Sequence, residues 1–227
     1  MGSLDKAGNW RRAEGRVFII RHGQRAPIVG RADGDPPLTE IGRKQADFAG
    51  RHLHKLKFKG RIVASPYRRT LETASLIAKH IGGRILVCPE IQEFVPGRGR
   101  PGVKQRPLTE LKKEFSLISE DSVLKIPWGV SGPETLFSLA TRLDRALCGI
   151  AYPDISSDIL LVSHGYLLKA LDLLMKDIKG PEIPKMPVDW NCAISEYKLG
   201  KNTSPVCIRF LDASFLPDEL VTNNIYG

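Results

Sequence analysis

Three short clusters of basic side chains follow apolar segments that have the pattern of buried β-strands. The clusters are RHGQR at residues 21–25, SPYRR at residues 65–69 and SHG at residues 163–165. In α/β proteins the loops and helix N-termini that follow strands present free N–H groups, and ligands bind there. One arginine or histidine in such a place is usually solvated or bonded to a carbonyl, but three basic clusters are hard to explain as coincidence. We therefore expect them to converge on one rim of a sheet.

The side chains in these clusters suit a tetrahedral dianion such as phosphate. Arginine presents a planar fork of N–H donors that matches phosphate oxygens, and it stays charged at any accessible pH. A neutral histidine is a nucleophile toward phosphorus, and nearby positive charge lowers its pKa and keeps it unprotonated near pH 7. Positive charge also stabilises the equatorial oxygens of a phosphoryl group during transfer. The pattern therefore predicts phosphate binding and phosphoryl transfer at one site.

Strand and helix patterns alternate around these clusters. Short β-branched runs predict strands over residues 16–21, 61–65, 84–88 and 158–163 and a C-terminal hairpin over 193–199 and 206–210. Helical spacing predicts helices after a Thr39 cap, over 67–80, after a capping box that begins at Ser131, and over 166–175. This alternation indicates an α/β fold with a mainly parallel central sheet and helices on both faces, which the hairpin extends at one edge.

The length favours one domain. We expect a single domain over residues 15–227, preceded by a flexible or vector-derived N-terminus over residues 1–14. Residues 95–130 interrupt the alternation and are interpreted as an insertion that forms one wall of the site. The insertion begins with the basic stretch PGRGRPGVKQR at residues 96–106, whose arginines either read an acidic substrate or face water. These arginines are Arg98, Arg100 and Arg106.

Composition and charge limit the function classes. Subtracting 25 acidic from 34 basic side chains gives a net charge of +9, which favours anionic partners, but no nucleic-acid-binding motif accompanies it. No apolar run approaches the roughly 20 residues of a membrane-spanning helix, and the N-terminus lacks the pattern of a secretory signal. The four cysteines have no CxxC pairing, which is typical of reduced thiols. We expect a cytoplasmic protein without nucleic-acid or membrane partners.

Six motifs, in this order, resemble those of the histidine phosphatase superfamily, also called phosphoglycerate-mutase-like. They are RHGQR (21–25), DPPLTEIGRKQA (35–46), SPYRRTLETA (65–74), PEIQE (89–93), LLVSHG (160–165) and NCAISEYKL (191–199). The resemblance runs from about residue 16 to residue 210 and implies the phosphoglycerate-mutase-like fold. With Arg25 after RHGQ, the first motif resembles the RHGxR motif of the suppressor of T-cell receptor signalling phosphatase domains and of the insect ecdysteroid-phosphate phosphatases. The RHGxSxWN motif and ERxYG-like insertion of cofactor-dependent phosphoglycerate mutases are absent from the sequence.

The resemblance implies a role for individual residues. It makes His22 the nucleophile that becomes phosphorylated, and it makes Glu93 the general acid, with Glu90 as the rival. It places four side chains in the phosphate pocket, and Arg69 is preferred to Arg68 because it takes the fifth place in SPxxR. These four are Arg21, Arg25, Arg69 and His164.

We therefore expect a phosphomonoester hydrolase that works through a phosphohistidine, with no metal and no cofactor. The substrate stays open between a phosphorylated small molecule and a phosphotyrosine protein. One alternative is a phosphoglycerate-mutase-type phosphotransferase. Another is a non-catalytic module that binds phosphorylated ligands, against which the intact set of basic residues argues. The edge strands at the C-terminal end allow a homodimer.

Overall fold

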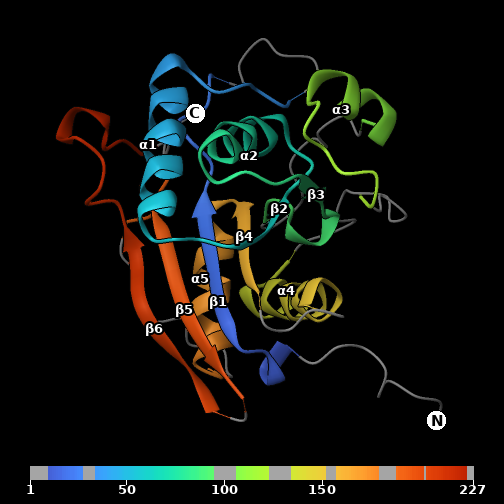
Figure 1. The fold of residues 1–227 in the computed structure, drawn as a ribbon, viewed down its shortest axis with the longest axis vertical. Helices are drawn as coiled ribbons and strands as arrows, with labels where there is room; N and C mark the ends of the chain where they lie inside the picture. Colours follow the sequence, from blue (N-terminus) through green and yellow to red (C-terminus); the bar gives the residue numbers. More distant parts are fainter. Residues whose placement is uncertain are drawn as a thin grey trace.

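The computed structural model describes residues 10–27, 34–94, 106–122, 134–151, 157–178, 188–201 and 203–223. Its centre is a six-stranded sheet with the strand order β3-β2-β4-β1-β5-β6 (Figure 1). The strands are β1 (Gly15–Arg21), β2 (Gly60–Ala64), β3 (Ile85–Val87), β4 (Asp158–Ser163), β5 (Ile194–Gly200) and β6 (Thr203–Asp212). The first four are parallel to one another, whereas β5 is antiparallel to β1 and β6 to β5. The mainly parallel sheet with a C-terminal hairpin at its edge is confirmed.

The two central strands, β1 and β4, are buried on both faces. Their apolar runs pair in register from Val17 opposite Ile159 to Arg21 opposite Ser163. Strands of a parallel sheet covered on both faces read as continuous apolar runs, which is the pattern of these two segments. The register brings the residues that follow each strand, His22 and His164, to neighbouring positions at the carboxyl edge of the sheet.

Helices cover both faces, as expected. On one face lie α1 (Glu40–Lys55), α2 (Arg68–Ile81) and α3 (Leu108–Glu114), and on the other lie α4 (Leu136–Ala151), α5 (Gly165–Met175) and the short 3-10 helix η2 (Trp10–Arg12). Side chains of β1 alternate between the two cores: Phe18 and Ile20 join the first, whereas Val17 and Ile19 join the second. The sheet is therefore the middle of three layers.

The residues at the starts of α1 and α4 can be compared with the predicted helix caps. The cap of α1 is confirmed, because the Thr39 hydroxyl accepts the N–H of Gly42 at 3.0 Å. Ser131, where a capping box is predicted, lies outside the described residues, and Glu134, the other member of that box, pairs with a side chain of α4. A reciprocal pair of hydroxyl-to-backbone bonds joins Thr135 and Ser138 at the start of α4. The described cap of α4 therefore lies at Thr135.

The N-terminal boundary also needs correction. Trp10 is 2% exposed, and its indole N–H donates to the Asp144 carboxylate at 2.7 Å. Burial of this indole and of Ala13 fixes the chain from residue 10 onward, so the expectation of a flexible segment to residue 14 is wrong for residues 10–14. Residues 1–9 lie outside the described part of the chain.

The described part of the expected insertion extends the sheet layer beside β3. Leu111 of α3 is buried, and the backbone of Ile85 bonds to Leu117 and Ser119 at 2.9 and 2.8 Å. Arg98 and Arg100 lie outside the described residues. In the described part of the chain, no helix has both the length and the apolar character needed to cross a membrane.

Candidate active site

The carboxyl ends of β1 and β4 lie side by side next to α2 (Figure 1). The N–H of His22 donates to the Ser163 carbonyl at 2.9 Å, and the imidazole rings of His22 and His164 approach edge to face with centroids 5.4 Å apart. Both histidines are buried. The pairing register of the two strands, set by their apolar residues, therefore places both imidazoles at one point.

His22 is held as a neutral, oriented imidazole. Its Nδ1 lies 2.8 Å from the carbonyl of Gly23, which makes Nδ1 the protonated nitrogen and leaves the Nε2 lone pair free. Burial, followed by the charge of Arg69 and the proximity of His164, holds the pKa of His22 well below its usual value. A neutral nitrogen with a free lone pair at neutral pH is what a nucleophile needs.

Gly23 permits the close approach of α1 to this turn. A Cβ at Gly23 would lie 2.4 Å from the carbonyl oxygen of Gly42, which belongs to the first turn of α1. The Gly23 N–H in turn donates to the hydroxyl of Thr73 on α2 at 3.1 Å. Two helices therefore fix the residue that holds the His22 ring.

Arg69, in the first turn of α2, is the central cation of the site. It is 5% exposed, and its Nη2 lies 3.3 Å from the Glu93 carboxylate and 3.2 Å from Nδ1 of His164. Its Nη1 lies 3.6 Å from the Asp35 carboxylate. Its Nε is buried and has no hydrogen-bond partner among the described residues. Buried donors are normally satisfied, so this one is suited to a ligand.

Arg21, the last residue of β1, supplies a second buried cation. Its Nη1 donates to the Asp189 carbonyl and to the side-chain oxygen of Asn223, at 2.8 Å for the latter. The Asp189 carboxylate lies 3.5 Å away. The Nε of Arg21 is also buried without a partner in the part of the chain that the structure describes. Two guanidiniums with spare donors therefore flank the histidine pair.

His164 and Glu93 form a coupled pair. His164 Nε2 lies 2.9 Å from the Ser65 hydroxyl, and its Nδ1 lies 3.2 Å from the Glu93 carboxylate. Burial lowers the pKa of His164 to about 4 although Glu93 opposes this shift. Burial would raise the pKa of Glu93, but the attraction of His164 and Arg69 outweighs it and holds that pKa well below its usual value. At neutral pH the pair is therefore a neutral imidazole beside a carboxylate.

Arg25 and Glu90, the remaining predicted residues, have described contacts other than the histidines. The Arg25 side chain donates to the Ala26 carbonyl at 3.1 Å, and its backbone forms an isolated antiparallel β-bridge with Leu38. Neither contact involves His22 or His164. The Glu90 carboxylate lies 3.5 Å from Arg145 on α4, away from the cluster that contains Glu93.

Two further basic residues are engaged elsewhere. The Arg68 guanidinium lies 2.7 Å from Glu114, so Arg69 rather than Arg68 reaches the site. Arg106 pairs with Glu110 and Glu114, at 2.8 and 2.7 Å.

Several residues that support the cluster received no role from sequence reasoning. The Asn191 side chain donates to the His22 carbonyl at 3.3 Å, and the Asp35 carboxylate accepts the backbone N–H of Arg68 at 2.8 and 3.0 Å. Both belong to motifs quoted above, DPPLT and NCAIS, which was the available signal. Asp189 and Asn223, which hold Arg21, lie in no such motif.

The cluster also has a geometry that can ligate a metal. His22, Glu93 and His164 each offer one ligand atom, and these atoms all lie within 4.8 Å of one another. Two imidazoles and a carboxylate suit several divalent metals. However, the Arg69 guanidinium lies 3.3 Å from the Glu93 carboxylate and 3.2 Å from His164 Nδ1, where its charge repels a dication and attracts a dianion. The donor set therefore fits an anion better than a metal.

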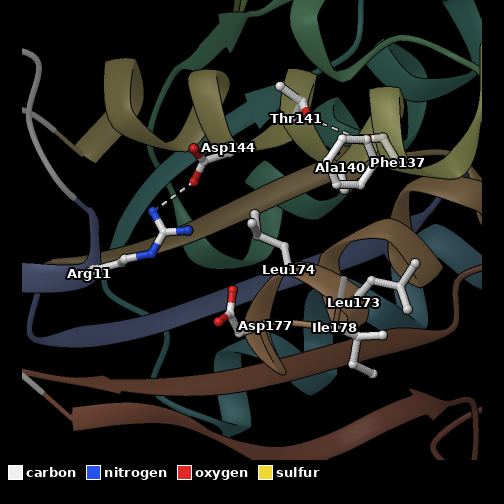
Figure 2. A pocket seen from close by; sticks show the side chains of 9 residues that line it. All are labelled: Arg11, Phe137, Ala140, Thr141, Asp144, Leu173, Leu174, Asp177 and Ile178. Carbon is white, nitrogen blue, oxygen red and sulfur yellow. Dashed lines mark hydrogen bonds and ion pairs between the residues drawn. The ribbon is translucent and has the colours of Figure 1, made fainter. Parts of the chain in front are cut away.

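A pocket of about 130 Å³ lies between α4 and α5 and is separate from this cluster (Figure 2). Figure 2 shows apolar side chains on its walls, with Arg11 paired to Asp144 on one side. Leu173, Leu174 and Ile178 line it at the C-terminal end of α5, whereas His164 directly precedes the N-terminal end of that helix. The pocket and the histidine pair therefore lie at opposite ends of α5.

Comparison with known proteins places the chain in a family. Residues 17–210 match the model of the histidine phosphatase superfamily, branch 1. Among curated proteins, the mitochondrial serine/threonine-protein phosphatase Pgam5 of Drosophila sechellia is 30% identical over 216 residues, which cover 92% of this chain and 67% of that protein. The Drosophila melanogaster protein of the same name is also 30% identical over the same shares.

Two solved structures with the same fold are phosphatases of lower sequence identity. The ecdysone phosphate phosphatase of Bombix mori, in complex with tungstate, has a TM-score of 0.69 at 21% identity and covers 87% of this chain and 95% of its own. A phosphoserine phosphatase from Entamoeba histolytica has a TM-score of 0.62 at 22% identity and covers 89% and 100%. With the family model spanning most of the sheet and both histidine motifs, the chain belongs to branch 1 of the histidine phosphatase superfamily and is a hydrolase of the histidine-phosphatase type.

Proposed function

We propose that this protein hydrolyses phosphate monoesters through a phosphohistidine on His22 and needs no metal ion. One observation carries the proposal: a neutral imidazole with a free Nε2 faces two buried guanidiniums, each with an unpartnered Nε among the described residues. Phosphoryl transfer is catalysed by positioning and by positive charge around the equatorial oxygens. The cluster provides both.

In the first step, His22 Nε2 attacks phosphorus while the bond from phosphorus to the ester oxygen breaks. The unpartnered Nε donors of Arg21 and Arg69 hold the phosphoryl oxygens, and His164 joins them by exchanging its bond to Ser65 or Glu93 for one to the phosphate. Glu93 gives its proton to the leaving oxygen, so that an alcohol departs. In the second step, water attacks phosphorus, its proton passes to the Glu93 carboxylate, and the bond from nitrogen to phosphorus breaks. Phosphate then leaves, and both side chains are restored.

The pKa of Glu93 requires that the substrate itself prepare the acid. In the free protein Glu93 is ionised because it faces Arg69 and His164. A bound dianion would take over the Arg69 guanidinium and place negative charge beside Glu93, and both changes raise the pKa of a carboxyl group. Glu93 would then be protonated only when a substrate is present.

Metal independence follows from the charge of the site. Arg69 lies within 3.3 Å of the ligand atoms of Glu93 and His164, where a dication would have to displace it. We therefore expect EDTA to leave turnover unchanged and vanadate to inhibit, because its five-coordinate adduct resembles the transition state. Loss of activity on chelation, with recovery on adding a divalent metal, would refute this part of the proposal.

The substrate class is proposed from the relatives as a phosphate monoester of an alkyl alcohol. The Pgam5 relatives are named as serine/threonine-protein phosphatases, and two proteins of the same fold are named for phosphoserine and ecdysone phosphate. Phosphate release should be measured on phosphoserine, phosphothreonine and phosphotyrosine peptides, a steroid phosphate and small sugar phosphates.

An assay of 3-phosphoglycerate isomerisation distinguishes a phosphatase from the mutase alternative. Isomerisation without phosphate release would favour a mutase, and retention of phosphorylated ligands without turnover would favour a binding module.

A further inference from the structure

We propose that Arg142 on α4 is a positioning residue for Glu93, and that Glu134 holds the Arg142 guanidinium in place for this purpose. The inference rests on the proposed role of Glu93 as the acid and base of the reaction. It assigns a function in the reaction to an ion pair that does not touch the phosphate pocket.

The segment that leads into Glu93 is held by its carbonyl groups. It contains the short 3-10 helix η3 (Pro89–Ile91), whose few internal bonds cannot fix it alone. Arg142 Nη1 donates to the Glu90 carbonyl at 2.5 Å and to the Gln92 carbonyl at 3.2 Å, and its Nη2 also reaches the Gln92 carbonyl at 3.2 Å. The guanidinium thus joins the carbonyls on either side of Ile91.

A fourth bond, to the Ile91 carbonyl, completes the set. The hydroxyl of Ser163, the last residue of β4, donates to the Ile91 carbonyl at 2.7 Å and is fully buried. The three consecutive carbonyls before Glu93 are therefore bonded to the residue that precedes His164 and to one arginine of α4. This arrangement fixes the Glu93 backbone relative to the histidine pair.

The Arg142 guanidinium is itself fixed by a two-point ion pair. Its Nε and Nη2 lie 3.0 and 3.1 Å from the two carboxylate oxygens of Glu134, and both side chains are buried. Every nitrogen of the guanidinium therefore has a partner. A planar fork bound to a carboxylate on one edge can present its other donors to the carbonyls in only one orientation.

A fixed backbone matters at Glu93 because its side chain has to serve two positions. In the free protein its carboxylate bonds Arg69 and His164, and during the reaction it would reach the leaving oxygen and later the water. Proton transfer depends on a heavy-atom approach of about 2.6–3.2 Å. A backbone shift of a fraction of an ångström at Glu93 would therefore weaken acid catalysis without touching His22.

The test compares leaving groups in single-turnover phosphorylation of the full chain. Loss of an acid slows an alkyl phosphate much more than p-nitrophenyl phosphate, whose phenolate leaves unaided. We expect Arg142→Met to lower the alkyl-to-aryl rate ratio roughly tenfold or more, with Arg142→Lys intermediate. Glu134→Gln should shift the ratio in the same direction but less. In a Glu93→Gln background, Arg142→Met should cause no further change in the ratio.

The matched control is Arg61→Met. Arg61 also donates to a backbone carbonyl of α4, that of Ile150 at 2.8 Å, but it does not contact the segment before Glu93. The alkyl-to-aryl rate ratio of Arg61→Met should equal that of the wild type. If Arg142→Met does not yield folded protein by circular dichroism, Arg142→Lys decides.

The outcomes separate the inference from the proposed function. Equal losses on both leaving groups in the Arg142 variants, or a change in ratio that adds to that of Glu93→Gln, would show a structural role only and overturn the inference. Failure of Glu93→Gln itself to change the ratio would refute the proposed acid instead.

Discussion

Two buried arginines of this protein, Arg69 on α2 and Arg142 on α4, each pair with a glutamate but use their donors in opposite ways. All three nitrogens of Arg142 bond to Glu134 or to carbonyls of the segment before Glu93. The Nε of Arg69 has no hydrogen-bond partner among the described residues, and the positive charge of Arg69 repels that of the nearby Arg21.

The difference separates a side chain that completes the fold from one that is left for a ligand. An unsatisfied buried donor costs about 1–3 kcal/mol, and like charges in a buried site add to this cost. A fold tolerates such a cost where a dianion later supplies the missing acceptors and the missing charge. Arg142 has no such vacancy and is expected to contribute to stability in the free protein.

The largest effect should come from exchanging these two arginines separately for methionine. Arg69→Met should reduce kcat/KM about 10³–10⁵-fold, the range for an arginine that stabilises a transferring phosphoryl group. It should lower the free energy of unfolding less than Arg142→Met does, because the Asp35 carboxylate keeps its bonds to the backbone N–H of Arg68. Arg142→Met should destabilise the protein by about 3–5 kcal/mol, because it leaves Glu134 buried and unpaired. Urea unfolding and steady-state kinetics on the same samples test the contrast. Equal destabilisation by the two substitutions would contradict this contrast between Arg69 and Arg142.

The next effect concerns Glu93, which both arginines hold in different ways. Glu93→Gln should slow phosphorylation by an alkyl phosphate about 10²–10⁴-fold, because general acid catalysis contributes that much, and slow p-nitrophenyl phosphate far less. Burst measurements on both substrates give the two rates. Glu90→Gln is the control, since Glu90 pairs with Arg145 outside the cluster. A selective loss in Glu90→Gln instead would move the acid three residues back.

A smaller effect is expected on stability as a function of pH. Burial lowers the pKa of His164 to about 4 and that of His22 well below its usual value. Below about pH 6.5 the unfolded histidines bind protons that the folded protein excludes, so stability is complete above that pH and falls as the pH decreases. Each histidine should cost up to about 2 kcal/mol between pH 6.5 and 5.

Urea unfolding at several pH values measures this slope. His164→Gln should reduce this slope. A slope that His164→Gln leaves unchanged would contradict the buried, neutral state of that imidazole.

The smallest effect is predicted for Arg25. Its side chain donates to the carbonyl of the adjacent Ala26, and we expect it to act on phosphate through water, where a unit charge contributes about 1 kcal/mol. Arg25→Ala should therefore raise KM roughly fivefold and leave kcat unchanged. A loss as large as that of Arg69→Met would show that Arg25 moves into direct contact with the substrate.

Much of the site could be predicted because its residues lie where short apolar strands end. The runs before His22 and His164 indicate buried parallel strands, and neighbouring strand ends meet at one edge. Residues that reach the site from outside these strand ends could not be placed in this way. Asp189 and Asn223, which hold Arg21, come from loops whose course depends on tertiary packing.

Some features could not be predicted because local pattern does not report long-range partners. The ion pair of Glu134 with Arg142 on α4 does not follow from the spacing of Ser131 and Glu134. The N-terminal segment has no periodicity, yet Trp10 packs into the core with α4 and α5, where Asp144 accepts its N–H. The homodimer and the cytoplasmic location stay predictions, to be tested by analytical ultracentrifugation and cell fractionation.

The measurement that tests the central claim most directly is trapping of the phosphoenzyme. Brief incubation with labelled substrate and quenching without acid should leave phosphate on the protein that is acid-labile and base-stable. Peptide mapping should place this phosphate on His22, and His22→Ala should carry no label and show no turnover. Label on a serine or cysteine, or turnover by His22→Ala at the wild-type rate, would contradict the account.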